Sequence, residues 1–124
     1  MPMPWTYRHA QKEFQAFLGD ARERMNLVSD NSTYTAVEGV LRTFRARLTP
    51  PQALAFADVL PAVLRALFVA HWDIAAPPRP FAPRAEMTRE AQALRPHHNL
   101  TPENAIEAVA WALWRCVDHR DLAR

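Results

Sequence analysis

The sequence of 124 residues contains only two glycines and a single cysteine. With Gly19 and Gly39 alone, the chain cannot build a glycine-rich loop that cradles phosphate groups. Because Cys116 has no second cysteine to pair with, an internal disulfide is excluded, and a reducing cytoplasm is the expected compartment. The N-terminal residues lack the apolar stretch of a secretory signal, and the most apolar run, VLPAVLRALFVA, is too short to span a bilayer.

The sequence also lacks a block of positive charge. Its net charge is only +2, and acidic residues alternate with arginines, as in Glu38 and Arg42. Nucleic-acid-binding proteins usually gather their positive charge on one face. We therefore treat nucleic-acid binding through Arg42, Arg45 and Arg47 as an alternative function and not as the leading one.

Strand signals are nearly absent, and eleven prolines divide the chain into segments with helical periodicity. Thr49-Pro50 and Thr101-Pro102 each place a capping hydroxyl before a proline, and Gln52 completes a capping box with Thr49. The pattern predicts an all-α bundle of about six helices, at residues 7–25, 33–47, 50–59, 61–70, 84–94 and 102–117. The fourth is apolar nearly all round, so we expect it to be the most buried.

Two of the expected helices share an apolar skeleton. EGVLRTFRARL at 38–48 and EAVAWALWRCV at 107–117 align without a gap at a constant offset (107 − 38 = 69). The residues expected to face the core align in four pairs: Val37 with Ile106, Leu41 with Ala110, Phe44 with Leu113, and Leu48 with Val117. In the preceding helices, Leu18 aligns with Met87 and Met25 with Leu94.

This alignment predicts one compact domain built from two related helical units. The first unit covers residues 1–72, a proline-rich linker covers 73–83, and the second unit covers 84–124. We expect the second unit to be incomplete at its C-terminal side, because the sequence after Val117 is too short to repeat the helices at 50–59 and 61–70.

The two copies differ beside the shared apolar seam. Where the first has Arg42 and Arg45, the second has Trp111 and Trp114. On a helical wheel the two indoles form a ridge next to the seam, and with Glu107 they are the candidate interaction surface. The ridge can be covered within the chain, by the N-terminal arm or a further helix, or by a partner protein or second copy in a homodimer.

The stretch LRTFRARLTPPQALAFADVLPAVLRALFVAHWD, residues 41–73, resembles the signature of an uncharacterised bacterial family, the domain-of-unknown-function family twenty-two sixty-seven. Its most specific part runs from a Leu-Pro pair to a Trp-Asp pair. The matching residues are Arg45, Arg47, Leu48, Thr49, Leu60, Pro61, Val63, Leu64, Arg65, Leu67, Phe68, Trp72 and Asp73. The resemblance covers most of the chain and implies an all-α pair of repeats with no established activity. It also implies a second unit that usually ends in another Leu-Pro segment, which this sequence does not reach.

Few residues have the spacing that catalysis or metal binding requires. Cys116 and His119 lie three residues apart, but no glycine-rich oxyanion turn accompanies them. A zinc site made from these two with His97 and His98 lacks the two short-spaced ligand pairs that zinc sites usually show. Glutamates spaced four apart lie beside arginines, as on a solvated helix surface. We predict no catalytic residue, no metal and no cofactor.

A second candidate site lies where the most apolar segment ends. Arg65, Trp72 and Asp73 could line a ligand-binding or catalytic pocket between the two units. Alternatively they form a structural corner, in which Asp73 pairs with Arg65 or caps a turn and Trp72 covers the core. The leading prediction is a small helical interaction or structural module of the bacterial cytoplasm, without catalytic activity.

Overall fold

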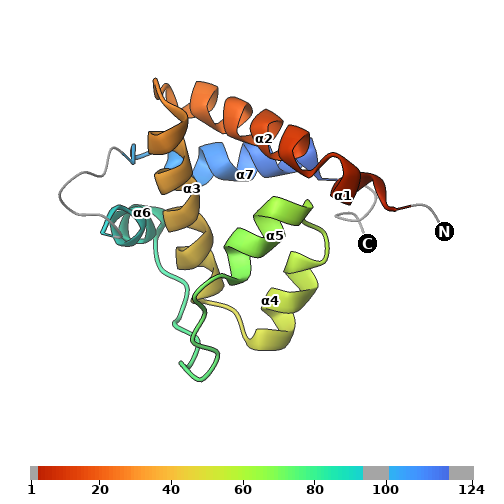
Figure 1. The fold of residues 1–124 in the computed structure, drawn as a ribbon. Helices are drawn as coiled ribbons and strands as arrows, with labels where there is room; N and C mark the ends of the chain where they lie inside the picture. Colours follow the sequence, from red (N-terminus) through yellow and green to blue (C-terminus); the bar gives the residue numbers. More distant parts are fainter. Residues whose placement is uncertain (1–2, 94–100, 118–124) are drawn as a thin grey trace.

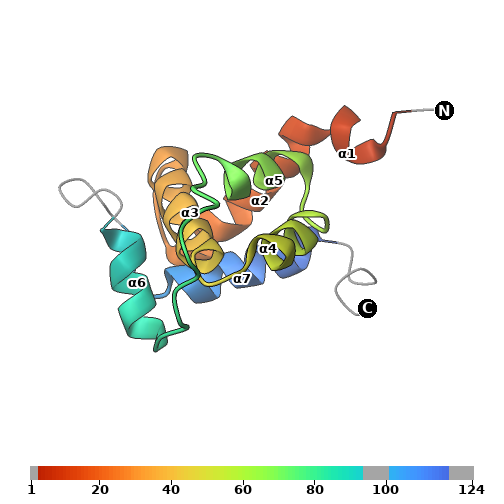
Figure 2. The same ribbon diagram turned by 90° about the horizontal axis from the view of Figure 1, so that it is seen from below.

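The computed structural model describes residues 3–93 and 101–117. Within these ranges the chain forms helices and no strands, so the predicted all-α class is confirmed (Figures 1 and 2). The helices are α1 (Trp5–Arg8), α2 (Ala10–Met25), α3 (Asp30–Arg45), α4 (Pro50–Ala57), α5 (Ala62–Val69), α6 (Arg84–Gln92) and α7 (Ala105–Cys116).

The starts of α3 and α4 follow local capping signals. α4 begins with the predicted capping box: Thr49 Oγ1 accepts from the Gln52 N–H at 3.3 Å, and Gln52 Oε1 accepts from the Thr49 N–H at 3.0 Å. α3 begins earlier than predicted because Ser29 caps it, its Oγ accepting from the Ser32 N–H at 3.1 Å. The predicted cap at Thr101 is wrong, since α7 begins only at Ala105.

Two further boundary predictions are corrected. The helix expected at 7–25 is divided at His9, whose φ of −120° is not helical, so that α1 and α2 are separate. The helix expected at 84–94 ends at Gln92, and Leu94 lies outside the described residues.

The prediction that residues 61–70 are the most buried is wrong. α5 buries Leu64 and Phe68, but Ala66 on the same helix is exposed. The most buried helix is α3, which is contacted by α2, α5, α6 and α7. α5 packs against α2, α3 and α4, but its apolar residues Val63, Leu67 and Val69 are only half-buried.

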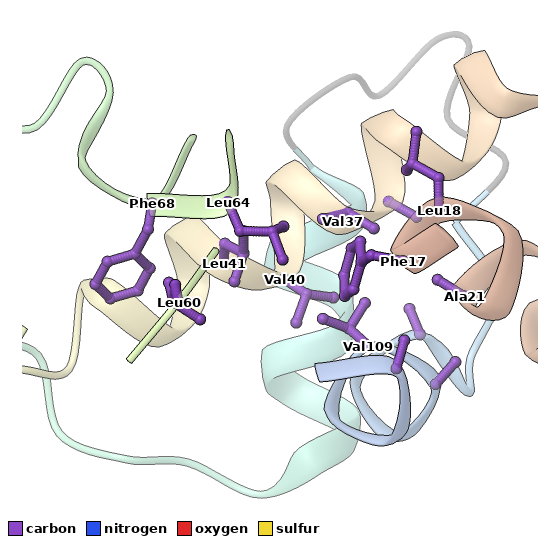
Figure 3. Close-up of a cluster of buried hydrophobic side chains, with 14 of the residues drawn as sticks. Phe17, Leu18, Ala21, Val37, Val40, Leu41, Leu60, Leu64, Phe68 and Val109 are labelled. Carbon is purple, nitrogen blue, oxygen red and sulfur yellow. The ribbon is translucent and has the colours of Figure 1, made fainter. Parts of the chain in front are cut away.

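The bundle is organised around α3. α2 lies against α7, α6 lies against α3, and α5 packs against both α2 and α3 (Figure 1). The side chains that meet at the centre come from four helices (Figure 3): Phe17, Leu18, Val37, Val40, Leu41, Leu64, Phe68 and Val109. Because the core joins helices that are distant in sequence, α7 is held in place chiefly by α2 and α3.

Gly39 sets the distance between α3 and α6. A Cβ atom at this position would lie 2.7 Å from the carbonyl oxygen of Ala91, well inside van der Waals contact. We expect Gly39→Ala to displace α6 and to lower the free energy of unfolding by about 1–3 kcal/mol, because the steric cost exceeds the gain in helix propensity. Urea unfolding followed by circular dichroism measures this change.

Gly19 in α2 provides the matched control. A Cβ atom there would meet nothing within 4 Å, so Gly19→Ala should raise the free energy of unfolding by roughly 0.5–1 kcal/mol. If both substitutions stabilise the protein equally, α3 and α6 do not approach each other as closely as described.

Candidate functional site

An apolar groove opens between α7 and the helices around it. It has a volume of about 350 Å³ and is lined by side chains of α3, α4, α6 and α7 and of the residues that follow α4 and α7. The lining residues are Val40, Leu41, Thr43, Phe44, Phe56, Val59, Leu60, Met87, Ile106, Val109, Ala110, Leu113, Trp114 and Val117. We call this the α7 groove. An open apolar site of this size is a usual place for a ligand or partner to bind.

The groove exists because α7 buries a different face from the one that the sequence predicts. Its fully buried residues are small: Ala105, Ala108, Val109 and Ala112. Of the four residues predicted to face the core, only Val117 is buried; Ile106 and Leu113 are half-buried and Ala110 is exposed. Small residues let α2 and α3 approach α7 closely. The prediction of the inward face is therefore wrong, and the predicted seam lines the groove instead.

The two tryptophans of α7 have different surroundings. Trp114 lines the groove, with 52% of its surface exposed. Trp111 is half-buried, and two guanidinium groups lie over its ring, those of Arg24 at 4.8 Å and Arg115 at 5.1 Å from the ring centroid. Such cation–π contacts stabilise the position of an indole. Trp111 is thus covered within the chain, whereas Trp114 faces the groove.

Glu107, the third residue of the predicted interaction surface, contacts the same arginine as Trp111, Arg24. Its Oε1 accepts a hydrogen bond from Arg24 Nη2 at 2.6 Å, which joins α7 to α2. The hydrogen bond from Arg24 lowers the pKa of the Glu107 carboxyl. The carboxylate therefore carries its charge at neutral pH and helps to fix Arg24 over the indole.

The N-terminal arm does not supply the cover that we considered for the indole ridge. Trp5 and Tyr7 both remain about half exposed. The Trp5 ring packs on His9 with centroids 4.6 Å apart, and the Tyr7 hydroxyl accepts from Arg65 Nη1 at 3.4 Å. The arm thus lies near the start of α5, where Thr6 Oγ1 also accepts from the N–H of Ala62.

The structure does not bring Arg65, Trp72 and Asp73 together as one site. Arg65 donates to the main-chain carbonyls of Ala57 and Leu60, at 3.0 and 3.2 Å, and so caps the end of α4. Of the two roles considered for Asp73, the structure shows the capping of a turn and not the pairing with Arg65: Asp73 Oδ1 accepts from the Ala75 N–H at 3.1 Å.

Trp72 packs against the hydrophobic core and also covers the guanidinium of Arg45, which lies 5.6 Å from its ring centroid. Arg45 is buried and donates to the carbonyls of Phe68 and Ala70, at 3.1 and 2.8 Å, so that it caps the end of α5. Burial lowers the pKa of Arg45, but a guanidinium stays charged at neutral pH.

The three arginines of α3 and its C-terminal end do not form an exposed basic surface. Arg45 and Arg47 are buried, and Arg42 lies 3.4 Å from the carboxylate of Glu38. Arg47 is bonded to Glu90 of α6 through both terminal nitrogens, at 2.8 and 2.6 Å. Arg45 and Arg47 thus join α3 to α5 and α6, whereas Arg42 pairs within α3.

Of the remaining chemical candidates, Cys116, His97, His98 and His119, only Cys116 lies within the described residues. Burial, together with the charge of Glu13, raises the pKa of the Cys116 thiol to about 12, so the thiol is not a nucleophile at neutral pH. His97, His98 and His119 lie outside the described residues. Among residues 3–93 and 101–117, no three His, Cys, Asp or Glu side chains are grouped to hold a metal. In these same ranges, no helix combines the length and apolarity that crossing a bilayer requires.

Sequence reasoning missed the groove residues that lie outside α7. Phe56, Val59 and Leu60 come from α4 and the turn after it, and Met87 comes from α6. Their places on the groove depend on the tertiary packing of α4 and α6, which the periodicity of the sequence does not predict.

Together these features define an all-α bundle with one side of its last described helix open as an apolar groove. A family model described as "Uncharacterized conserved protein (DUF2267)" matches residues 14–124, and the chain belongs to this family. The resemblance in the stretch from Leu60-Pro61 to Trp72-Asp73 is thereby confirmed. No curated protein matches the chain.

Proposed function

We propose that this protein is a helical interaction module that binds an amphipathic helix of a partner protein in the α7 groove and catalyses no reaction. The observation that carries the proposal is the groove, which is lined by apolar side chains of four helices and flanked by the half-exposed Trp114. Helix-in-groove binding requires such a surface, and an aromatic side chain in it is a common source of binding energy.

The chemistry of the lining favours binding over catalysis. Among the described lining residues, Thr43 supplies the only side-chain hydroxyl, and none is titratable. General acid–base or nucleophilic catalysis needs groups that ionise or attack within reach of a substrate. An apolar helix needs neither, since it satisfies its own main-chain hydrogen bonds.

The expected strength of binding is moderate. Burying four large apolar side chains in the groove would contribute roughly 6–12 kcal/mol. Association itself costs about 4–15 kcal/mol in lost freedom of motion. The most favourable balance of these ranges, about 8 kcal/mol, corresponds to a micromolar Kd, so we expect a reversible contact, as in a regulatory or scaffolding module. The expected location in the bacterial cytoplasm stays a prediction from the single cysteine.

The alternative functions are less well supported by the contacts. An enzyme or ligand site at Arg65 and Trp72 would need polar groups directed into a common space, but these two residues cap and cover helix ends. Nucleic-acid binding would need exposed cations, but Arg45 and Arg47 are buried.

Photo-crosslinking from inside the groove tests the proposal. Ala110 is exposed and lines the groove, whereas Ala16 is exposed on α2 and does not. With a photoreactive phenylalanine at position 110, irradiation in the source cells should give a defined protein adduct that is missing with the same group at position 16. Sequencing of the cross-linked peptide should place it in an amphipathic helix.

Three outcomes of this experiment would contradict the proposal. They are adducts of equal yield from positions 110 and 16, an adduct with a lipid or other small apolar molecule, and an adduct with a second copy of the chain. Thermal unfolding of both labelled proteins serves as the control that each one is folded.

A further inference from the structure

We infer that the partner helix in the α7 groove is of the same kind as α5, with leucine or phenylalanine side chains spaced four residues apart, and that it lies between α6 and α7 as α5 lies between α2 and α3. This inference rests on the proposed function and names the chemistry of the partner. It follows from a comparison of two faces of the same molecule, one covered and one open.

α3 and α7 bury equivalent residues. At the offset of 69 residues (105 − 36 = 69), four positions are buried in both helices. These pairs are Ala36 and Ala105, Gly39 and Ala108, Val40 and Val109, and Thr43 and Ala112. The two-unit interpretation stays a prediction, but the two helices present the same face to the interior.

The helices around α3 and α7 are placed in equivalent ways. α2 lies against α7, and α6, its expected counterpart, lies against α3 (Figures 1 and 2). α5 occupies the angle between α2 and α3. The equivalent angle is the one between α6 and α7, and the α7 groove has walls from both: Met87 from α6, and Ile106 and Leu113 from α7.

On α3, the face equivalent to the open face of α7 is covered by α5. Leu64 and Phe68 of α5 are fully buried beside Leu41 (Figure 3), and the Phe68 ring lies 6.4 Å from that of Phe44. Leu41 is therefore only 2% exposed. Its counterpart Ala110 is exposed, and the counterpart of Phe44, Leu113, is half-buried.

The substitutions between the two faces specify the occupant further. Ala110 is smaller than Leu41, so the groove has room opposite it for a side chain larger than Leu64, such as phenylalanine. Trp114 is the counterpart of Arg45 at the same offset. On the covered face, Arg45 donates to the carbonyls of Phe68 and Ala70 at the end of α5. An indole at this place favours an apolar end of the partner helix over a charged one.

The groove is also continuous with an existing interface. Leu41, Phe44 and Leu60 line it and at the same time belong to the packing between α3 and the α4–α5 segment. A second copy of the chain is a poorer occupant, because Leu64 and Phe68 of that copy are already buried. A separate protein with a free amphipathic helix fits better.

A synthetic peptide that copies residues 49–70 provides the test. It spans α4 and α5 and contains no tryptophan, so a fluorescent label on the peptide and the intrinsic tryptophan fluorescence of the protein report separately. We expect the labelled peptide to bind the full chain with a Kd of roughly 10–100 μM, weak because an isolated segment of this length is only partly helical. The same peptide carrying Leu64→Phe should bind more tightly, by roughly threefold or more.

Matched variants locate the binding. Ala110→Glu in the protein puts a charge in the groove and should weaken peptide binding at least tenfold, whereas Ala16→Glu should leave it unchanged. In the peptide, Phe68→Asp should abolish binding. Light scattering is measured alongside, and wild type and Ala110→Glu should both be monomeric.

The outcomes separate this inference from the proposed function. Absence of peptide binding, or binding that Ala110→Glu does not weaken, would overturn the α5-like partner. A cross-linked partner helix without leucine or phenylalanine at four-residue spacing would do the same and leave the proposed function intact. A dimer that Ala110→Glu dissociates would overturn both, in favour of a second copy.

Discussion

Replacing Glu90 with alanine is expected to lower the free energy of unfolding by about 3–5 kcal/mol, because it leaves a buried cation without its partner. The side chain of Arg47 is only 2% exposed. It donates to both carboxylate oxygens of Glu90 and to the carbonyl of Thr43. Arg79 of the proline-rich linker also pairs with Glu90. One carboxylate thus ties together α3, α6 and the linker, and chemical unfolding measures its contribution.

A double variant is the control for this prediction. Arg47→Met combined with Glu90→Ala removes both charges, and we expect it to be more stable than Glu90→Ala alone by at least about 2 kcal/mol. If the single and double variants are equally unstable, the loss comes from packing and not from the unpaired guanidinium.

The same ion pair predicts how stability depends on pH. Hydrogen bonds from Arg47, and the nearby charge of Arg79, hold the pKa of the Glu90 carboxyl below its usual value. Since the folded-state pKa is the lower one, the stabilisation is fully present above the unfolded value of about 4.3. It is lost as the pH falls through the folded-state pKa. Stability curves of wild type and Glu90→Gln should therefore converge in acid, and parallel curves down to pH 3 would contradict the pairing.

Arg45→Met is the other substitution with a large expected effect, a loss of about 2–4 kcal/mol. Arg45 is buried and satisfies the carbonyls of Phe68 and Ala70 at the end of α5. Methionine fills part of the volume but donates no hydrogen bond, so these acceptors would be left without this donor. The end of α5 should then loosen and expose Trp72, which packs on the guanidinium.

Tryptophan fluorescence and urea unfolding together check this prediction. Arg45→Met should shift the tryptophan emission to longer wavelength, because Trp72 becomes more exposed to solvent. It should also shift the unfolding midpoint to a lower urea concentration. Arg45→Lys is the control, because it keeps the charge but cannot span two carbonyls with a planar group. Its free energy of unfolding should fall between those of the wild type and Arg45→Met. A variant as stable as wild type would show that Arg45 does not cap α5.

Local sequence determined the helical class and several helix starts. Thr49, Pro50 and Gln52 form a capping box through atoms only a few residues apart, so their pattern is sufficient to predict it. The Leu60-Pro61 to Trp72-Asp73 motif likewise identified the family. Ser29 carried an equally local signal, which the prediction of α3 overlooked.

Only the tertiary structure decided which face of α7 is buried and what lies beside its tryptophans. Periodicity shows that a helix has apolar residues, but α7 has two adjoining apolar stripes, and the choice depends on which one α2 and α3 can approach more closely. The stripe with Ala105, Ala108 and Ala112 is the buried one, so Ala110, Leu113 and Trp114 line the groove.

The partners of the arginines could not be predicted from the sequence either. Arg47 pairs with Glu90, and Arg24 binds Glu107 beside Trp111, across 43 and 83 residues of chain. Sequence spacing predicts charge partners only within a helix, where residues three and four apart are neighbours. The sequence alone therefore established an all-α chain with two similar helices, one bearing arginines and one bearing indoles. The packing of distant helices decided that Arg45 and Arg47 hold the bundle together, while Trp114 is left facing an apolar groove.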